Sequence, residues 1–143
     1  MTPTIRFQRV GDHALAVPSY YSDDAAGMDL PSNGQFIIAP GEQVKIPTGW
    51  AVEIPRGFEG TVRPRSGLST NRRLKVTLGT IDSDYRGEIA VVLTNESENI
   101  EPILVGDRVA QLVISPVARC KIELAVVLSE TRRGSSGWGS SGK

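Results

Sequence analysis

The chain has 143 residues, with 16 basic and 16 acidic side chains and a formal net charge of zero. This length suits one domain with a sizeable core. A neutral balance provides no overall field that would draw the protein to nucleic acid or to a membrane. No stretch approaches the roughly 18 apolar residues that cross a bilayer, and no apolar run near the N-terminus predicts a secretory signal. We therefore expect an intracellular, cytoplasmic protein that binds neither nucleic acid nor membrane.

One cysteine and one histidine limit the metal and redox chemistry open to this sequence. Cys120 has no second cysteine with which to form an internal disulfide. With His13 alone it cannot complete a Cys/His zinc site. We expect Cys120 on a strand and His13 in a loop.

Short segments rich in valine, isoleucine and threonine recur along the chain, separated by turn sequences such as "SNGQ", "APGEQ" and "IPTG". Such spacing is typical of an all-β domain. We expect about nine or ten strands, of which the clearest lie at residues 35–39, 43–47, 50–54, 59–63, 74–78, 88–94, 108–114 and 122–128. Only residues 69–73 are compact and polar enough for a helical turn. The expected fold is a jelly-roll-like β-sandwich or barrel with one short helix.

Two of these segments, residues 88–94 and 108–114, are nearly continuous apolar runs rather than clean alternations. Such runs indicate strands that are covered on both faces. A domain of this size has little material for a second covering layer, so we expect another subunit to provide it.

The final segment, residues 131–143, consists mostly of glycine and serine around Trp138 and predicts a flexible arm outside the domain at residues 1–130. Composition alone also fits a disordered tail. A tryptophan in such an arm is, however, a side chain that stacks on nucleotide bases. The spacing of Gly137, Gly142 and Lys143 imitates a phosphate-binding P-loop, but that motif requires a following serine or threonine, which is missing here.

The sequence "IDSDYRGE", residues 81–88, begins like a calcium-binding EF-hand loop. That loop needs an oxygen ligand at its fifth position and a bidentate glutamate at its twelfth. Arg86 and Leu93 occupy those positions, so a calcium site is excluded.

Arg65, Ser66 and Gly67 follow a predicted strand in "VRPRSGLST". A guanidinium, a hydroxyl and an open backbone amide at one point can meet phosphate oxygens, although a surface turn with a paired arginine has the same composition. Gln111, within an apolar run, fits a hydrogen-bond partner between strands. Asp29, after small residues, fits a turn.

Taken together and in order, five segments resemble the trimeric deoxyuridine triphosphatases, the dUTPase family: "AAGMDL", "RPRSGLS", "GTIDSDYRGE", "GDRVAQLVI" and "RRGSSGWGSSG". The resemblance implies a jelly-roll homotrimer in which each of three sites is built from three chains. It also implies hydrolysis of dUTP to dUMP and pyrophosphate with Mg²⁺, which limits uracil incorporation into DNA and supplies dUMP for thymidylate synthesis.

The resemblance assigns the chemical step to Asp82, which would orient a water and accept its proton as the water attacks the α-phosphorus. Tyr85 would pack under the deoxyribose and exclude a 2′-hydroxyl. Asp84 and Arg86 are expected in pairs between strands or subunits rather than in catalysis. Uracil would be read by main-chain groups of Leu78, Gly79, Thr80, Ile81 and Tyr85.

Phosphate contacts are implied for a further set: Arg65, Ser66, Gly67, Gln111 and Arg133. The arm would close over the substrate with Trp138 stacked on uracil. Asp29 resembles an acid placed near the magnesium, acting through water, since Mg²⁺ favours water and phosphate oxygens as ligands. The remaining arm residues implied to contact the substrate are Gly137, Gly139 and Ser140.

Two other interpretations remain open from the sequence. A dCTP deaminase has a related fold, but the tyrosine-containing hairpin and the tryptophan-bearing arm favour a dUTPase. A trimeric binding or structural module could keep the fold without the chemistry, but Asp82, Arg65 and the arm are all present.

Overall fold

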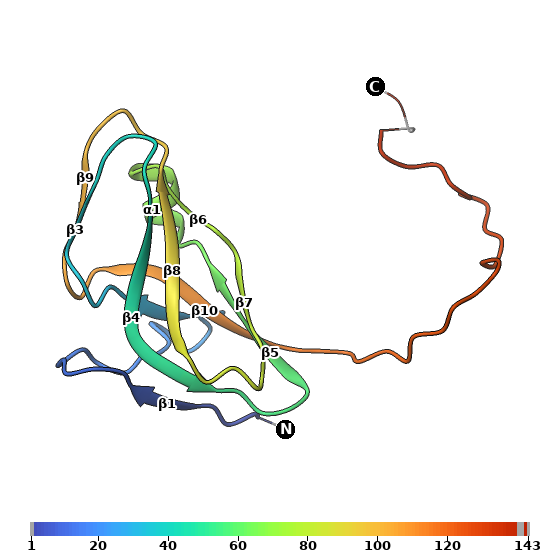
Figure 1. The fold of residues 1–143 in the computed structure, drawn as a ribbon, viewed down its shortest axis with the longest axis horizontal. Coiled ribbons are helices and arrows are strands. Elements are labelled where there is room, and N and C mark those ends of the chain that lie inside the picture. The colour runs from blue at the N-terminus through green and yellow to red at the C-terminus, as the bar shows by residue number, and fades with distance from the viewer. Residues whose placement is uncertain (1, 140–141, 143) are drawn as a thin grey trace.

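The computed structural model describes residues 2–139 and 142 (Figure 1). Ten strands and one short helix follow one another along the chain. Their bounds are β1 Arg6–Arg9, β2 Met28–Pro31, β3 Phe36–Ile38, β4 Gln43–Glu53, β5 Phe58–Arg63, α1 Ser66–Asn71, β6 Leu74–Val76, β7 Gly79–Ile81, β8 Glu88–Asn95, β9 Glu101–Ile103 and β10 Arg108–Pro116.

The strands form two four-stranded sheets, in the orders β1-β4-β8-β6 and β2-β10-β5-β7, and a two-stranded sheet of β3 and β9. Every strand pairing described is antiparallel. Neighbours in a sheet are often distant in sequence, as in the pairing of β2 with β10. The all-β, jelly-roll-like architecture with one short helix is confirmed.

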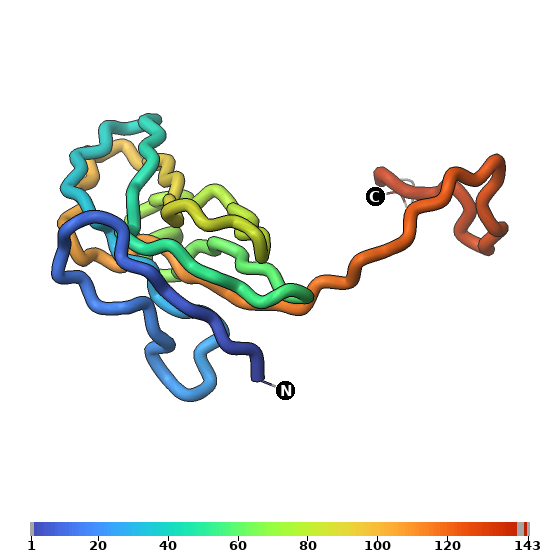
Figure 2. Tube along the Cα trace, turned by 60° about the horizontal axis from the view of Figure 1, so that its bottom comes forward, coloured from blue at the N-terminus to red at the C-terminus, as the bar shows by residue number. Residues whose placement is uncertain are grey.

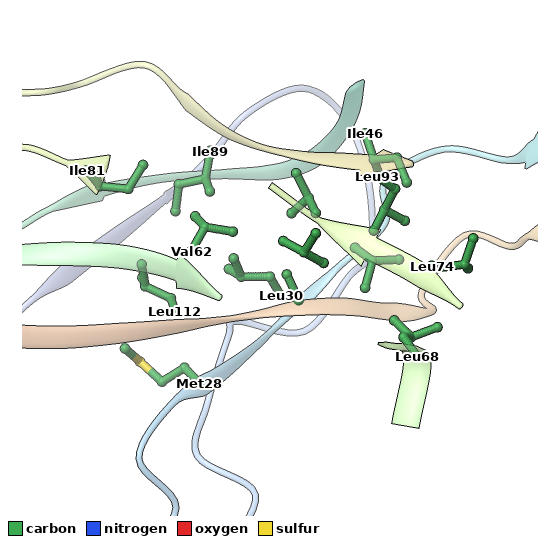
Figure 3. Close-up of a cluster of buried hydrophobic side chains, with 14 of the residues drawn as sticks. Met28, Leu30, Ile46, Val62, Leu68, Leu74, Ile81, Ile89, Leu93 and Leu112 are labelled. Carbon is green, nitrogen blue, oxygen red and sulfur yellow. The ribbon is translucent and has the colours of Figure 1, made fainter. Parts of the chain in front are cut away.

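The hydrophobic core lies between the two larger sheets (Figure 3). Along β8 the side chains alternate, with Ile89, Val91 and Leu93 fully buried and Ala90 and Val92 half-buried. Each fully buried leucine or isoleucine contributes about 1.5 to 3 kcal/mol of transfer free energy. The other face of β8, which carries Glu88, Ala90, Val92 and Thr94, is of mixed polarity and only partly covered within one chain.

Two expected elements differ from the structure. Residues 43–47 and 50–54 do not form separate strands but join in β4, with a register irregularity between Pro47 and Ala51. The turn-like sequence between them is accommodated as a bulge because β8 pairs with both flanks. The helix begins at Ser66 rather than at residue 69, because burial of Leu68 draws the earlier residues into its turn. Within the described residues, no helix is long and apolar enough to cross a membrane.

The strand expected at residues 122–128 is absent from the described part of the chain. After β10 the backbone leads away from the sandwich (Figures 1 and 2). Ile122, Leu124 and Val126 are 93%, 103% and 101% exposed. A strand needs a neighbour to pair its backbone groups, and this segment lies beyond the sheets of its own chain. The expectation of Cys120 on a strand is therefore wrong, whereas His13 lies in a loop as predicted.

A cluster around Trp50 fixes the loop after β1 to the bulge in β4. The His13 ring lies edge-on to Trp50, and its Nε2 is 2.8 Å from the Gly49 carbonyl oxygen. Its Nδ1 faces the Leu15 amide at 3.2 Å and a guanidinium nitrogen of Arg9 at 3.0 Å. Because Nδ1 faces two donors, the neutral tautomer with a proton on Nε2 fits this arrangement. Gly49 has φ of +79°, and a Cβ there would lie 2.5 Å from His13 Nε2.

Gly49→Ala is expected to destabilise the fold more than Gly41→Ala does. Both glycines have φ of +79°, but a Cβ at Gly41 meets open space. The left-handed backbone alone costs an alanine about 1 to 2 kcal/mol, and displacement of His13 adds about 1 kcal/mol or more. Urea unfolding measures both free energies. Equal losses of unfolding free energy in the two variants would show that the contact between Gly49 and His13 contributes nothing to the difference in stability.

Candidate active site

Strand register gathers the residues expected to bind phosphate, which we call the arginine–glutamine cluster: Asp29, Arg65, Ser66, Gly67 and Gln111. Gln111 on β10 lies between Asp29 of β2 and Arg63 of β5. The chain then turns through Pro64 into α1, which places Arg65 beside the same strands. Asp29 lies on a strand, not in the turn that its local sequence predicts.

Asp29 holds two arginines at this point. One of its carboxylate oxygens lies 2.8 Å from Nε of Arg65, and the other lies 3.5 Å from Nη1 of Arg108. Arg65 also donates a 3.2 Å hydrogen bond from Nη1 to the Arg108 carbonyl oxygen. The Asp29 side chain is only 19% exposed. The mostly buried carboxylate therefore partly neutralises and aligns two guanidinium groups. Arg108 was not singled out from the sequence, although it lies in the same motif as Gln111.

The Gln111 side chain is held on both sides. Its amide nitrogen donates a 2.9 Å hydrogen bond to the Pro64 carbonyl oxygen. This is the bond between neighbouring strands that its burial predicts. A Cβ on Gly27 would lie 2.6 Å from the Gln111 side-chain oxygen, so only glycine leaves room for that carboxamide. Gly27, the glycine in "AAGMDL", therefore leaves space for the Gln111 side chain. This role of Gly27 was not identified from the sequence.

Ser66 and Gly67 form the first turn of α1. Both are exposed, and a Cβ at Gly67 would meet nothing within 4 Å. The first backbone N–H groups of a helix have no partner within the helix. These two amides are consequently open to an anion that approaches Arg65.

A second group, which we call the hairpin group, consists of β7 and the turn that follows: Leu78, Gly79, Thr80, Ile81, Asp82 and Tyr85. The Tyr85 amide donates a 3.1 Å hydrogen bond to the Asp82 carbonyl oxygen and closes the turn. Ile81 points into the core at 8% exposure, whereas Leu78 is 68% exposed. Since the Ile81 side chain is buried, mainly its backbone faces outward.

The Tyr85 ring is positioned by its own turn. Its hydroxyl donates a 3.1 Å hydrogen bond to the Glu88 carbonyl oxygen. A Cβ on Gly87 would overlap the phenol, so the ring lies flat against a residue that must be glycine. Glu88 in turn accepts a 3.2 Å hydrogen bond from the Gly49 amide through its carboxylate. The turn is thus fastened to β4.

Arg86 lies in the turn between β7 and β8 and pairs with Glu53 at the end of β4 at 3.5 Å, so its ion pair joins a turn to a strand rather than two strands. Glu53 also lies 2.6 Å from Arg6 of β1. The hydrogen bond and the charge of Arg6, followed by the charge of Arg86, lower the pKa of Glu53 below its ordinary range. The carboxylate therefore stays ionised in mildly acidic solution.

Asp82 and the arginine–glutamine cluster lie toward opposite ends of β5. Ile81 pairs with Gly60, and Gly79 pairs with Val62. Asp82 is therefore near Glu59, six residues before Arg65, which corresponds to about 20 Å along an extended strand. A cleft of about 1000 Å³ beside β4 and β5 is lined by Asp82, and the arginine–glutamine cluster is not part of its lining. One chain keeps Asp82 apart from the arginine–glutamine cluster.

The described arm residues, exposed except for the half-buried Gly137, lie away from both groups (Figures 1 and 2). Nε of Arg133 donates a 2.7 Å hydrogen bond to the Ser136 carbonyl oxygen. Trp138 is 107% exposed and has φ of +51°. Gly137 and Gly139 flank it, and Ser140 lies outside the described residues.

The described residues contain no group of three or more histidine, cysteine, aspartate or glutamate side chains that could hold a metal ion. An ion bound mainly by phosphate oxygens and water needs no such group. Asp29 already accepts from two guanidiniums, so a contact to Mg²⁺ through water fits its surroundings better than direct ligation.

The dUTPase family model matches residues 13–142 of the chain. A deoxyuridine 5′-triphosphate nucleotidohydrolase of Anaeromyxobacter sp. (strain Fw109-5) is 46% identical, with 100% of each chain covered. One from Rhizobium etli (strain ATCC 51251) is 44% identical over 98% of this chain and 94% of that protein.

Solved structures agree with the sequence relatives. The dUTPase of Staphylococcus bacteriophage 80alpha with dUPNHPP is 26% identical, with a TM-score of 0.88 over 99% of this chain and 100% of that one. A mutant dUTPase of phage phi11 of S. aureus, described with a structural Mg(II) ion, is 25% identical, with a TM-score of 0.80 over 87% of this chain and 97% of that one. The chain belongs to the dUTPase family.

Proposed function

We propose that the chain hydrolyses dUTP to dUMP and pyrophosphate, with Mg²⁺, as a homotrimer whose sites are shared between subunits. The proposal rests on one observation. The arginine–glutamine cluster and the hairpin group both carry dUTPase-type residues and are each locally ordered, but in a single chain Asp82 lies about 20 Å along β5 from Arg65. Each is the half of a site that a neighbouring copy completes.

In the proposed reaction, Asp82 holds a water by its carboxylate and accepts a proton as the water oxygen bonds to the α-phosphorus. The bond from the α-phosphorus to the bridging oxygen breaks, and pyrophosphate leaves with that oxygen. Asp82 is exposed on its turn, so a water and a phosphate brought by another subunit can reach it. A positioned general base of this kind typically contributes about 10² to 10⁴ in rate.

Selectivity for a deoxyuridine is assigned to the hairpin group. The backbone of Leu78, Gly79, Thr80 and Ile81 would pair with the uracil edge, which is supported by the inward burial of Ile81. The Tyr85 ring would pack under the deoxyribose, where an added 2′-hydroxyl collides and loses its hydrogen bonds.

The triphosphate is assigned to the arginine–glutamine cluster of a neighbouring subunit. Arg65 presents a guanidinium, Ser66 and Gly67 present open amides, and Gln111 keeps one amide hydrogen free of its bond to Pro64. Arg133 of the arm would reach the terminal phosphates. Mg²⁺, when bound with the triphosphate, neutralises phosphate charge, with Asp29 near its water shell.

The trimer is supported by apolar surface that one chain leaves in water. Ile122, Leu124, Val126, Val127 and Leu128 are each more than 80% exposed. Such a contiguous patch marks an interface. The half-covered outer face of β8 also requires another layer. We assign the cover of these surfaces to neighbouring copies, and the arm that follows them would carry Trp138 to a neighbour's site.

Pyrophosphate release from dUTP, measured beside dTTP, dCTP and UTP at equal concentration with Mg²⁺, tests the function. We expect rapid release from dUTP alone. Asp82→Asn is expected to lower kcat by about 10² to 10⁴, because the amide cannot accept the proton. Asp84→Asn, an exposed acid in the same turn, is the matched control and should leave kcat unchanged. Ammonia release from dCTP would instead identify a deaminase, and a loss below about tenfold in Asp82→Asn would remove the base assignment.

Gly87→Ala is expected to lower the preference for dUTP over UTP, because the added methyl group displaces the Tyr85 ring from the sugar position. The ratio of kcat/KM for the two nucleotides should fall by about tenfold or more. Tyr85→Phe keeps the ring over Gly87 and loses only the bond to Glu88, so its ratio should fall less. An unchanged ratio in Gly87→Ala would show that the ring does not read the sugar.

Truncation after Thr131 is expected to leave a folded trimer that hydrolyses dUTP poorly. The deletion spares the apolar segment at residues 122–128 but removes Arg133 and Trp138. Loss of base stacking alone is worth about 1 to 3 kcal/mol, or about 5- to 150-fold in kcat/KM. Light scattering gives the oligomeric state. Unchanged kcat and KM would exclude a role of the arm in closing the site.

A further inference from the structure

Arg86 makes more contacts to the turn that carries Asp82 than an incidental surface arginine would. Its Nη1 donates hydrogen bonds to the Ser83 carbonyl oxygen at 2.7 Å and to the Tyr85 carbonyl oxygen at 3.0 Å. Its Nη2 lies 3.5 Å from a carboxylate oxygen of Glu53. One planar guanidinium thus joins two points of the turn to the end of β4.

Glu53 is itself held in place from the other side. Arg6 of β1 lies directly opposite Glu53 in the antiparallel register, and Arg6 Nη1 is 2.6 Å from the second carboxylate oxygen. The contacts therefore run from β1 through β4 to the turn between β7 and β8 (Figure 1). We call this chain of contacts, Arg6–Glu53–Arg86, the turn clamp.

We propose that Arg86 is a positioning residue, fixed by the turn clamp, which sets the direction in which Asp82 and Tyr85 leave their turn. The inference rests on the proposed function, in which this turn carries the water-activating carboxylate and the ring under the sugar. Arg86 itself touches neither substrate nor the reacting water in this assignment. It acts through the backbone carbonyls on either side of Asp84.

The expected effects on rate and on folding free energy distinguish a positioning role of Arg86 from a role in stability. Arg86 and Glu53 are 56% and 42% exposed, and exposed ion pairs contribute little to the free energy of folding. A misplacement of about 1 Å in a reacting group can nevertheless cost about 10²-fold in rate. Loss of Arg86 should therefore reduce turnover far more than it reduces stability.

The shape of the Arg86 guanidinium distinguishes a positioning role from an effect of its positive charge alone. A guanidinium is a rigid fork that serves several acceptors in one plane, whereas a lysine ammonium is a point charge on a flexible stem. The same cleft is also lined by Arg56, Arg119, Glu59 and Asp84, so a simple charge effect would arise from several side chains rather than from Arg86 in particular.

The test compares Arg86→Gln, Arg86→Lys and Glu53→Gln with the matched control Arg56→Gln, whose arginine lines the cleft outside the turn clamp. Three measurements are made on the full chain with dUTP and Mg²⁺: kcat and KM, the thermal midpoint, and amide hydrogen exchange of residues 82–87.

Arg86→Gln should lower kcat by about 10- to 100-fold and speed exchange at the Tyr85 amide, with a nearly unchanged thermal midpoint. Arg86→Lys should recover only part of kcat, Glu53→Gln should show a smaller loss, and Arg56→Gln should match wild type.

Three outcomes would overturn the inference. The first is that Arg86→Gln keeps the kcat and the amide exchange of the wild type. The second is that Arg86→Lys has the full kcat of the wild type. The third is that Arg86→Gln and Arg56→Gln lose kcat equally. If Arg86→Gln does not fold, the kcat of Arg86→Lys and Glu53→Gln decides in the same way. Failure of the wild-type chain to hydrolyse dUTP would overturn the proposed function instead, and faster exchange in Arg86→Gln alone would then support the turn clamp.

Discussion

The pairing of β5 with β10 along one edge and with β7 along the other determines where each part of the candidate site lies. The first pairing brings Gln111 beside the residues that follow β5, and the second places Asp82 near the beginning of the same strand. An extended strand cannot fold back on itself, so Asp82 and Arg65 stay about 20 Å apart in one chain. In the proposed function, a substrate that contacts both Asp82 and Arg65 would therefore be processed where two copies meet.

The sequence predicts the elements whose signal is local. Residues 88–94 and 108–114 lie in strands, as their composition indicates, but burial along β8 alternates although its sequence is a nearly continuous apolar run. The expectations from sequence are wrong where contacts between residues distant in the chain determine the bounds of an element. Continuous pairing with β8 makes one strand of residues 43–53, and burial of Leu68 moves the helix. The apolar, strand-like residues 122–128 remain unpaired because no edge of their own domain receives them.

The candidate site divides in the same way. Arg65 and Asp82 can be singled out from the sequence because they lie in motifs that resemble the dUTPase family. The residues that support them cannot be identified in this way. A contact between strands leaves no local sequence pattern, and neither does a position where only glycine fits because a Cβ would collide with a neighbour. Gly27, just before β2, leaves room for Gln111 of β10, and Arg108 contacts Arg65 through its carbonyl oxygen and through the shared Asp29.

A main-chain reader of a base must be rigid, since a peptide group has no rotamers with which to compensate for a shifted backbone. The hairpin meets this requirement from several directions: Ile81 anchors it in the core, Tyr85 lies on Gly87, and the Glu88 carboxylate bonds to the Gly49 amide. Because Asp82 is exposed, its placement follows from this backbone rather than from packing of its own side chain. In the proposed function, base selection and water activation would therefore depend on one piece of backbone, and a change that loosens it should weaken both together.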